Sequence, residues 1–350
     1  MLNELRLVKF FQIFFLIIYH ILYWFFTGLD NKVIDPNGIL YLFALKTLPM
    51  MLFTTTLPIT SGIILYFRTK NRVIGKRLRS FPIKESLVMS GTLFIASEIL
   101  MIPINILEPN GYVFFWGILK FLAVSIPIVL LIAKIHLYII PVVALIIIIF
   151  APEIRGLLLP WHSYYIVKIL IGDVPGDFYW PMIPWISSVS IGYYIGHYFF
   201  NSSRSTNTKR ALIILFTLSL IAIIFKIERQ NSIEINGIYN DVFYPPTPTF
   251  IYYYLFYFSI YLFSIALSKV INLKRYGMIN IFSQMILVIY VVTVLAEIPI
   301  RHINDLIGGS KVTNLLIASI TLILANWALG FLISKYIIDR KITIRLMRKL

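Results

Sequence analysis

Long apolar runs separated by short polar connections fill almost the whole chain. A helix needs roughly 17–25 mainly apolar residues to cross the hydrocarbon core of a bilayer, and this length predicts roughly ten helices here. The fifth and the seventh of them are short. They are expected at residues 7–27, 39–67, 85–107, 113–133, 137–152, 181–200, 211–226, 248–271, 278–300 and 313–337.

The polar connections between these runs are too short for a separate soluble domain. The longest, around residues 153–180 and 226–244, are of loop size. We therefore treat residues 1–350 as one transmembrane domain. The N-terminal run follows Arg6 and Lys9 without the small-residue cleavage site of a signal peptide, so we expect it to be kept as the first helix.

Composition agrees with an all-α, polytopic membrane protein. Hydrophobic residues make up 59% of the chain and charged residues 13%, whereas a soluble domain has about 25% charged residues. Cysteine is absent, which excludes disulfides, thiolate metal sites and a cysteine nucleophile. No two histidines stand four residues apart beside a carboxylate, so no metal site is expected.

The net charge of +16 follows the membrane topology. Positive residues fall between the apolar runs on alternate sides, a distribution that orients membrane helices and gives no reason to expect nucleic-acid binding. We expect both termini in the cytoplasm and a multi-pass protein of the plasma membrane. The basic connections and the basic tail hold Arg68, Lys70, Arg72, Lys76, Arg77, Arg79, Lys84, Lys134, Arg204, Lys209, Arg210, Lys274, Arg275, Arg340, Lys341, Arg345, Arg348 and Lys349.

His20 is the most informative ionisable residue, because it lies well inside the first apolar run. Such groups are costly in hydrocarbon and usually face protein or water, and imidazole is suited to proton transfer near neutral pH. Other ionisable groups fall with it in the outer half of the membrane, which predicts a polar cavity open to the outside. The alternative is that the lysines extend to the interface and that the last glutamate pairs with Arg301. These groups are Lys46, Glu98, Lys120 and Glu297.

Four motifs occur in order along the chain. The first apolar run ends in FLIIYH, residues 15–20, followed by aromatic residues 23–26. The second carries LPITSG, residues 57–62, ahead of the basic connection. WPMIPW, residues 180–185, opens a run with Gly192 and Gly196, and YPPT, residues 244–247, opens a later one.

These motifs together resemble the transmembrane acyltransferases, in particular the branch of heparan-α-glucosaminide N-acetyltransferase and its prokaryotic relatives. Two motifs of that branch differ here. Its Asp-x-x-Arg-Gly would fall on residues 6–10, where Asp and Gly are missing, and its late Tyr-x-x-His would fall near Tyr290, without the histidine.

The resemblance implies transfer of an acyl group, expected to be acetyl, from cytosolic acyl-CoA to a hydroxyl or amine of a sugar or glycoconjugate across the membrane. His20 would act as general base or carry the acyl group itself, with Glu98 orienting its imidazole. The CoA phosphates would meet the basic connection, although positive-inside topology explains the same residues. The cations concerned are Arg68, Lys70, Arg72, Lys76, Arg77 and Arg79.

Acceptor binding is assigned to aromatic and charged residues near the outer side. Trp180, Trp185 and Tyr244 could stack on a sugar ring or belong to the interfacial aromatic belt, and both interpretations stay open. The charged substrate-binding candidates are Lys46, Lys120 and Glu297. Membrane lipids are further partners, and a homodimer is one option. The competing hypothesis is a transporter or flippase for a polar or lipid-linked substrate, which needs no base.

Overall fold

Two compact units make up the structure and are described separately: Met1–Thr55 with Ile260–Lys349, and Thr56–Ser259. The prediction of one domain over residues 1–350 stays a prediction. The computed structural model describes residues 3–26, 56–74, 77–107, 117–172, 180–200, 204–224, 249–270, 279, 283, 286–295, 317, 321–328 and 331–332.

The first unit contains α1 (Asn3–Phe26), α15 (Ile286–Leu295) and the second half of α13 (Thr249–Val270). α1 packs against α15 and buries Leu5 and Ile13. The Phe11 and Phe263 rings, from α1 and α13, lie 5.6 Å apart between centroids. Apolar contacts of this kind hold the first predicted span in a packed helical environment.

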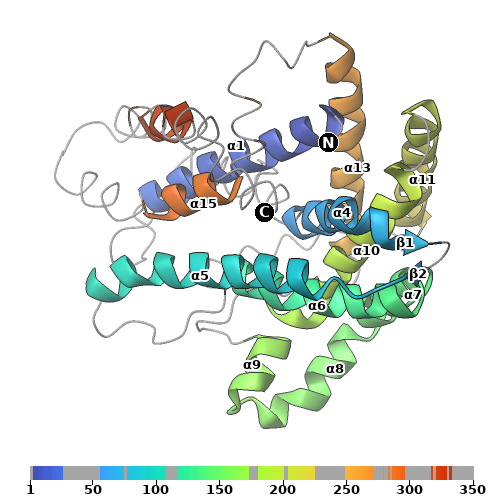
Figure 1. Ribbon diagram of the computed structural model, residues 1–350, viewed down its shortest axis with the longest axis horizontal. Coiled ribbons are helices and arrows are strands. Elements are labelled where there is room, and N and C mark those ends of the chain that lie inside the picture. Colours follow the sequence, from blue (N-terminus) through green and yellow to red (C-terminus); the bar gives the residue numbers. More distant parts are fainter. Residues whose placement is uncertain are drawn as a thin grey trace. The chain divides into compact units, whose positions relative to one another are not determined.

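The second unit is helical apart from a minimal hairpin, so the predicted all-α class is confirmed for the described residues (Figure 1). The antiparallel hairpin pairs Val73 with Leu78 and Ile74 with Arg77. The first half of α13 also belongs to this unit. The other elements are α4 (Leu57–Thr69), η2 (Lys70–Arg72), β1 (Val73–Ile74), β2 (Arg77–Leu78), α5 (Ile83–Leu107), α6 (Ile118–Ile135), α7 (Ile139–Ile149), α8 (Ala151–Leu158), η3 (Leu159–Trp161), α9 (Tyr165–Ile171), α10 (Met182–Phe200) and α11 (Arg204–Ile224).

Several of these helices meet the requirements for crossing a bilayer. Within the described residues, 118–135, 205–224 and 251–270 are long and apolar enough, and α7 with the segment 151–161 makes a fourth span if the bent pair is counted as one. The prediction of a polytopic helical membrane protein is therefore confirmed in its coarse form. The number of ten helices and the cytoplasmic termini stay predictions.

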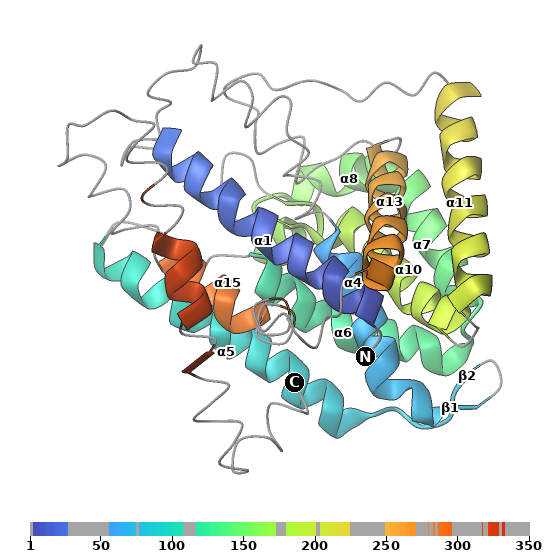
Figure 2. The ribbon, with the colours of Figure 1, turned by 90° about the horizontal axis from the view of Figure 1, so that it is seen from above.

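α4 and α10 cross in close backbone contact at glycines (Figure 2). A Cβ atom on Gly62 would lie 2.0 Å from the Val189 carbonyl oxygen, and one on Gly192 would lie 2.1 Å from the Ile59 carbonyl oxygen. A Cβ on Gly196 would lie 2.7 Å from that of Tyr66. Small residues let membrane helices approach closely without a hydrophobic driving force. The glycines of the second and third motifs therefore serve helix packing.

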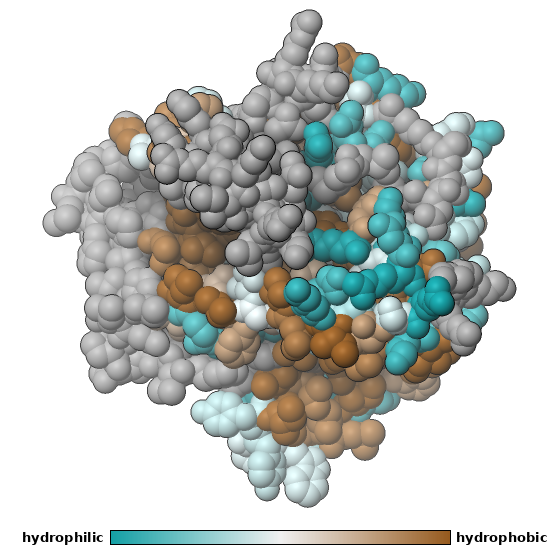
Figure 3. Space-filling view, viewed as in Figure 1, coloured by the Kyte–Doolittle hydropathy of each residue, from teal (hydrophilic) through white to brown (hydrophobic). Residues whose placement is uncertain are grey.

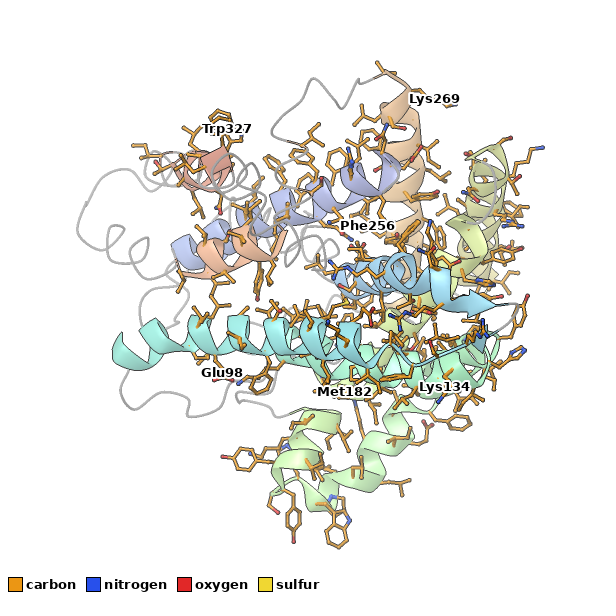
Figure 4. The ribbon with its side chains drawn as sticks, viewed as in Figure 1. Glu98, Lys134, Met182, Phe256, Lys269 and Trp327 are labelled. Carbon is orange, nitrogen blue, oxygen red and sulfur yellow. The ribbon has the colours of Figure 1, made fainter. Side chains whose placement is uncertain are left out.

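Contacts along the helices fix their relative directions within this unit. Glu98, in the second half of α5, pairs with Lys120 at the beginning of α6, so these two helices are antiparallel. α10 runs with α6, because Phe121 contacts Trp180 near their starts and Tyr138 contacts Tyr194 near their ends. Basic residues consequently gather at one end. In Figure 4, Glu98 of α5 lies on the left and Lys134 of α6 lies on the right, towards the basic end.

The region between residues 153 and 180 corrects a sequence expectation. We expected a loop-sized polar connection, but in its described part, up to Gly172, the chain forms α8, η3 and α9. Glu153 and Arg155 raise the polarity of the segment, yet Ile154, Leu157 and Leu158 share its helical period. The predicted span 137–152 is also shorter than expected, because α7 ends at Ile149 and bends by 61° into the next helix.

Candidate functional site

His20 lies on α1, within the first described helix, as the sequence predicted. Nothing is described of its side chain, and Arg77 in β2 is likewise described only by its backbone. The other predicted site residues outside the described part of the chain are Lys46, Lys76, Tyr244 and Glu297. Their roles, and the pairing of His20 with Glu98, stay predictions.

Glu98 and Lys120, which were predicted for different roles, form an ion pair. The Lys120 Nζ lies 2.7 Å from Glu98 Oε1, and the Lys120 side chain is 1% exposed against 49% for Glu98. The same ammonium lies 5.4 Å from the centroid of the Phe94 ring. A buried cation is strongly attracted to a carboxylate in a medium of low dielectric constant. Lys120 therefore points into the helix packing rather than extending to the interface.

Trp180 and Trp185 form the centre of an aromatic cluster at the start of α10. Their ring centroids lie 4.6 Å apart, Phe121 stacks on Trp180 at 6.2 Å, and Tyr253 stacks on Trp185 at 5.6 Å. Trp180 has a φ of 61°, which is rare for a bulky residue. Both indoles are buried, and each has at least one ring contact with an aromatic residue from another helix. Stacking on a sugar ring stays a prediction.

Arg155 joins this region, although the sequence assigned it to a loop. Its guanidinium donates to the Ile183 carbonyl at 3.1 Å, from α8 to the beginning of α10. The Ser125 hydroxyl lies 3.9 Å from the Met182 sulfur in the same region. Local sequence offered no signal for either contact, because both join residues from different helices.

The basic connection forms η2 and the β1–β2 hairpin, which follow the C-terminal end of α4. Lys70 and Arg79 are exposed, and the Lys70 ammonium lies 5.3 Å from the Phe67 ring centroid. Arg72 is engaged in an ion pair with Glu85 at the start of α5. Arg68 lies just beyond the predicted span 39–67, and burial lowers the pKa of its guanidinium to about 10. It therefore stays charged at neutral pH.

Figure 3 shows hydrophilic residues gathered over the end of α4 and the hairpin that follows. More cations reach the same end from other helices. The Arg210 guanidinium of α11 lies 4.1 Å from the centroid of the Tyr198 ring of α10, and Lys134 lies in the last turn of α6. One end of this unit is thus basic, while the ion pair and the tryptophan cluster lie towards the other.

The comparison with protein families gives a match over the first two thirds of the chain. A family model described as heparan-alpha-glucosaminide N-acetyltransferase, catalytic, matches residues 3–226. The chain belongs to this family. A search of curated proteins and a search of solved structures found no match.

The region matched by the N-acetyltransferase family includes most of the predicted site. It contains His20 of α1, the basic connection, the Glu98–Lys120 ion pair and both tryptophans of the aromatic cluster, Trp180 and Trp185. It ends before Tyr244, so the family match carries no information on that residue. The resemblance inferred from the four motifs is confirmed at the level of the family.

The part of the chain that the structure describes contains no group of residues suited to bind a metal ion. Nowhere among those residues do three or more histidine, aspartate or glutamate side chains come together.

Proposed function

We propose that this protein is a membrane-embedded acyltransferase that moves an acetyl group from cytosolic acetyl-CoA to a hydroxyl or amine of a sugar or glycoconjugate across the membrane. The observation that carries this proposal is the catalytic-domain match over residues 3–226, which contains His20. The helical membrane spans are consistent with transfer between two sides.

His20 is proposed to move the proton of the acceptor. A neutral imidazole nitrogen takes the proton from the acceptor O–H or N–H while the acceptor atom bonds to the thioester carbonyl carbon. The carbon–sulfur bond then breaks, and coenzyme A leaves as a thiolate that takes up the proton from His20. In the covalent variant, a His20 ring nitrogen bonds to the thioester carbonyl carbon, the carbon–sulfur bond breaks, and coenzyme A leaves as a thiol that carries the second ring proton. The acceptor then bonds to the acyl carbon, the carbon–nitrogen bond breaks, and the acceptor proton returns to the imidazole.

The donor is proposed to approach the basic end of the molecule. CoA carries phosphates, which bind guanidinium and ammonium groups through charge-assisted hydrogen bonds. Lys70 and Arg79 are exposed there, whereas Arg72 is held by Glu85. The exposed pair is therefore the first choice for phosphate contacts among the cations of this connection.

Glu98 is proposed to orient the imidazole of His20 or to stabilise its cationic form, as the acid of a catalytic triad does. Its half-exposed side chain leaves part of the carboxylate accessible, while Lys120 supplies the opposite charge at 2.7 Å. Full activity in a Glu98→Gln variant would argue against this role.

The absence of cysteine allows a direct assay of the proposed transfer. Purified protein is incubated with acetyl-CoA and a panel of amino sugars, and released coenzyme A is measured with a thiol reagent, to which the chain itself contributes no signal. We expect His20→Ala to reduce the rate by a factor of about 10²–10⁴, the usual contribution of a general base. His136→Ala, in the turn after α6, is the matched control and should keep the rate.

A transfer rate in His20→Ala equal to that of the wild type would show that His20 is neither the general base nor the acyl carrier. The same preparation in vesicles addresses the competing class of function. Uptake of a sugar or lipid-linked sugar by the vesicles, with no thiol released under any condition, would indicate a transporter or flippase instead of an acyltransferase.

A further inference from the structure

The segment from α8 to α9 carries large apolar and aromatic side chains on its outside. The exposed fractions of these side chains range from 57% to 75%. Singly exposed apolar residues are ordinary, but a contiguous group indicates an interaction surface. The group consists of Leu157, Leu159, Trp161, Tyr164, Tyr165 and Ile166.

This segment leaves the helix bundle and returns to the same end of it. Arg155, early in the segment, donates to the Ile183 carbonyl at the start of α10. At its end, α9 packs against α10 with Val167 and Ile171 buried. His162, beside the tip, has its Nε2 3.1 Å from the carbonyl oxygen of Gly172, the residue that follows α9. α8, η3 and α9 thus form a helical hairpin that does not cross the bundle. In Figure 1 this hairpin projects away from α5 and α6.

The preceding helix α7 is too short to cross a bilayer alone. Its 11 residues span about 16 Å, roughly half of the ~30 Å hydrocarbon core. α7 begins at the basic end, directly after Lys134 and the turn at His136. α7 bends by 61° into α8. A helix of this length that enters the bilayer at the basic end has its bend within the hydrocarbon core.

Apolar residues are also exposed on the outside of α7. Val142, Leu145 and Ile149 are 53–55% exposed, as expected for a helix surface that faces lipid. Phe150 connects this surface to the exposed residues of α8. Figure 3 shows the brown apolar surface running to the lower edge of the molecule, where paler residues follow.

The residues at the tip of the hairpin are those that prefer a membrane interface. Trp161, Tyr164 and Tyr165 combine apolar rings with polar groups, and such residues are enriched at the level of the lipid headgroups. The Trp161 and Tyr164 rings lie 6.3 Å apart on the exposed side. The charged residues of the hairpin are Glu153 and Arg155 near its beginning and Lys168 near its end. Glu153 is exposed, whereas the Arg155 guanidinium donates to the Ile183 carbonyl.

We infer that α8, η3 and α9 form a lipid-embedded hairpin in the leaflet opposite the basic end. Its partner is the bilayer itself: Leu157, Leu159 and Ile166 contact acyl chains, while Trp161 and Tyr165 lie at headgroup level. This inference concerns the membrane-binding surface and does not depend on the acyltransferase activity.

The natural absence of cysteine makes this inference testable with single spin labels on the full chain. Labels are placed at Leu157→Cys, Ile166→Cys, Trp161→Cys and Tyr165→Cys, and the protein is reconstituted into phosphatidylcholine vesicles. Accessibility to oxygen and to a water-soluble nickel chelate is then measured. Phe216→Cys on the exposed face of α11 is the lipid reference, and Ser80→Cys between β2 and α5 is the aqueous reference.

We expect the labels at residues 157 and 166 to match the Phe216 reference, with high oxygen and low nickel accessibility. The labels at residues 161 and 165 should lie between the two references. Four labels that all match Ser80 would place the hairpin in water and overturn the inference. Labels closed to both reagents, with dipolar coupling between chains, would assign the surface to a second copy and overturn it equally.

Discussion

Lys120 and Glu98 form an ion pair in which the cation is buried and the carboxylate is half exposed. The Nζ–Oε1 distance is 2.7 Å, between α6 and α5. Because charges so buried are costly in an apolar medium, they persist where they are paired or have a function. The pair lies in the unit that also contains Trp180 and Trp185, and it holds the carboxylate that the proposed mechanism uses.

We expect Glu98→Gln to lower the free energy of unfolding, because it removes a negative charge from the buried Lys120 ammonium. The loss should lie between the ~0–1 kcal/mol of a surface ion pair and the ~3–5 kcal/mol of a fully buried one. Unfolding in detergent, followed by tryptophan fluorescence, measures it for Glu98→Gln, Lys120→Met and the double variant. Additive losses from the two substitutions would mean that the pair contributes no coupling energy.

The glycine contacts predict a steep cost for Gly192→Ala. Its added Cβ would lie 2.1 Å from the Ile59 carbonyl oxygen, and backbone cannot move aside as a flexible side chain can. We expect a loss of about 1–3 kcal/mol or more, the range for overpacked cores. Gly91→Ala is the matched control, because a Cβ on Gly91 meets nothing within 4 Å. Equal thermal stability of the two variants would contradict the close crossing of α4 and α10.

A buried hydrogen bond at the basic end of the same helix pair leads to a third prediction. The hydroxyl groups of Thr69 and Tyr193 lie 2.9 Å apart. Tyr193→Phe should cost about 1 kcal/mol, the usual net value of such a bond. Tyr198→Phe, on an exposed ring, serves as control in the same thermal unfolding measurement. A larger loss in the control would show that ring substitution, rather than the hydrogen bond, governs stability here.

If the basic connection around η2 and the β1–β2 hairpin binds the CoA phosphates, Lys70→Ala and Arg79→Ala should each raise KM for acetyl-CoA. The value of kcat should stay near that of the wild type. A charge-assisted hydrogen bond contributes about 1.5–3 kcal/mol, so an increase of about tenfold or more is expected at low salt. Lys209→Ala, an exposed cation on α11, is the control. Unchanged KM values in both hairpin variants, measured by thiol release, would leave topology as the reason for these charges.

Parts of the site could be predicted because they depend on local chemistry. The depth of His20 in an apolar run and the basic connection after the second run are visible in the sequence alone. The helices within residues 153–171 were not predicted, because the polar residues of this connection hide the helical period of Ile154, Leu157 and Leu158.

The sequence by itself determined that this is a helical membrane protein with basic and non-basic ends, since span length and lysine and arginine placement act locally. Its motifs also led to the N-acetyltransferase family. Only the tertiary structure decided that Lys120 meets Glu98 and that Gly62 and Gly192 bring two backbones together. Such pairings depend on how each helix is rotated and where it crosses its neighbour. Those choices are settled by packing over the whole unit, and no local pattern contains them.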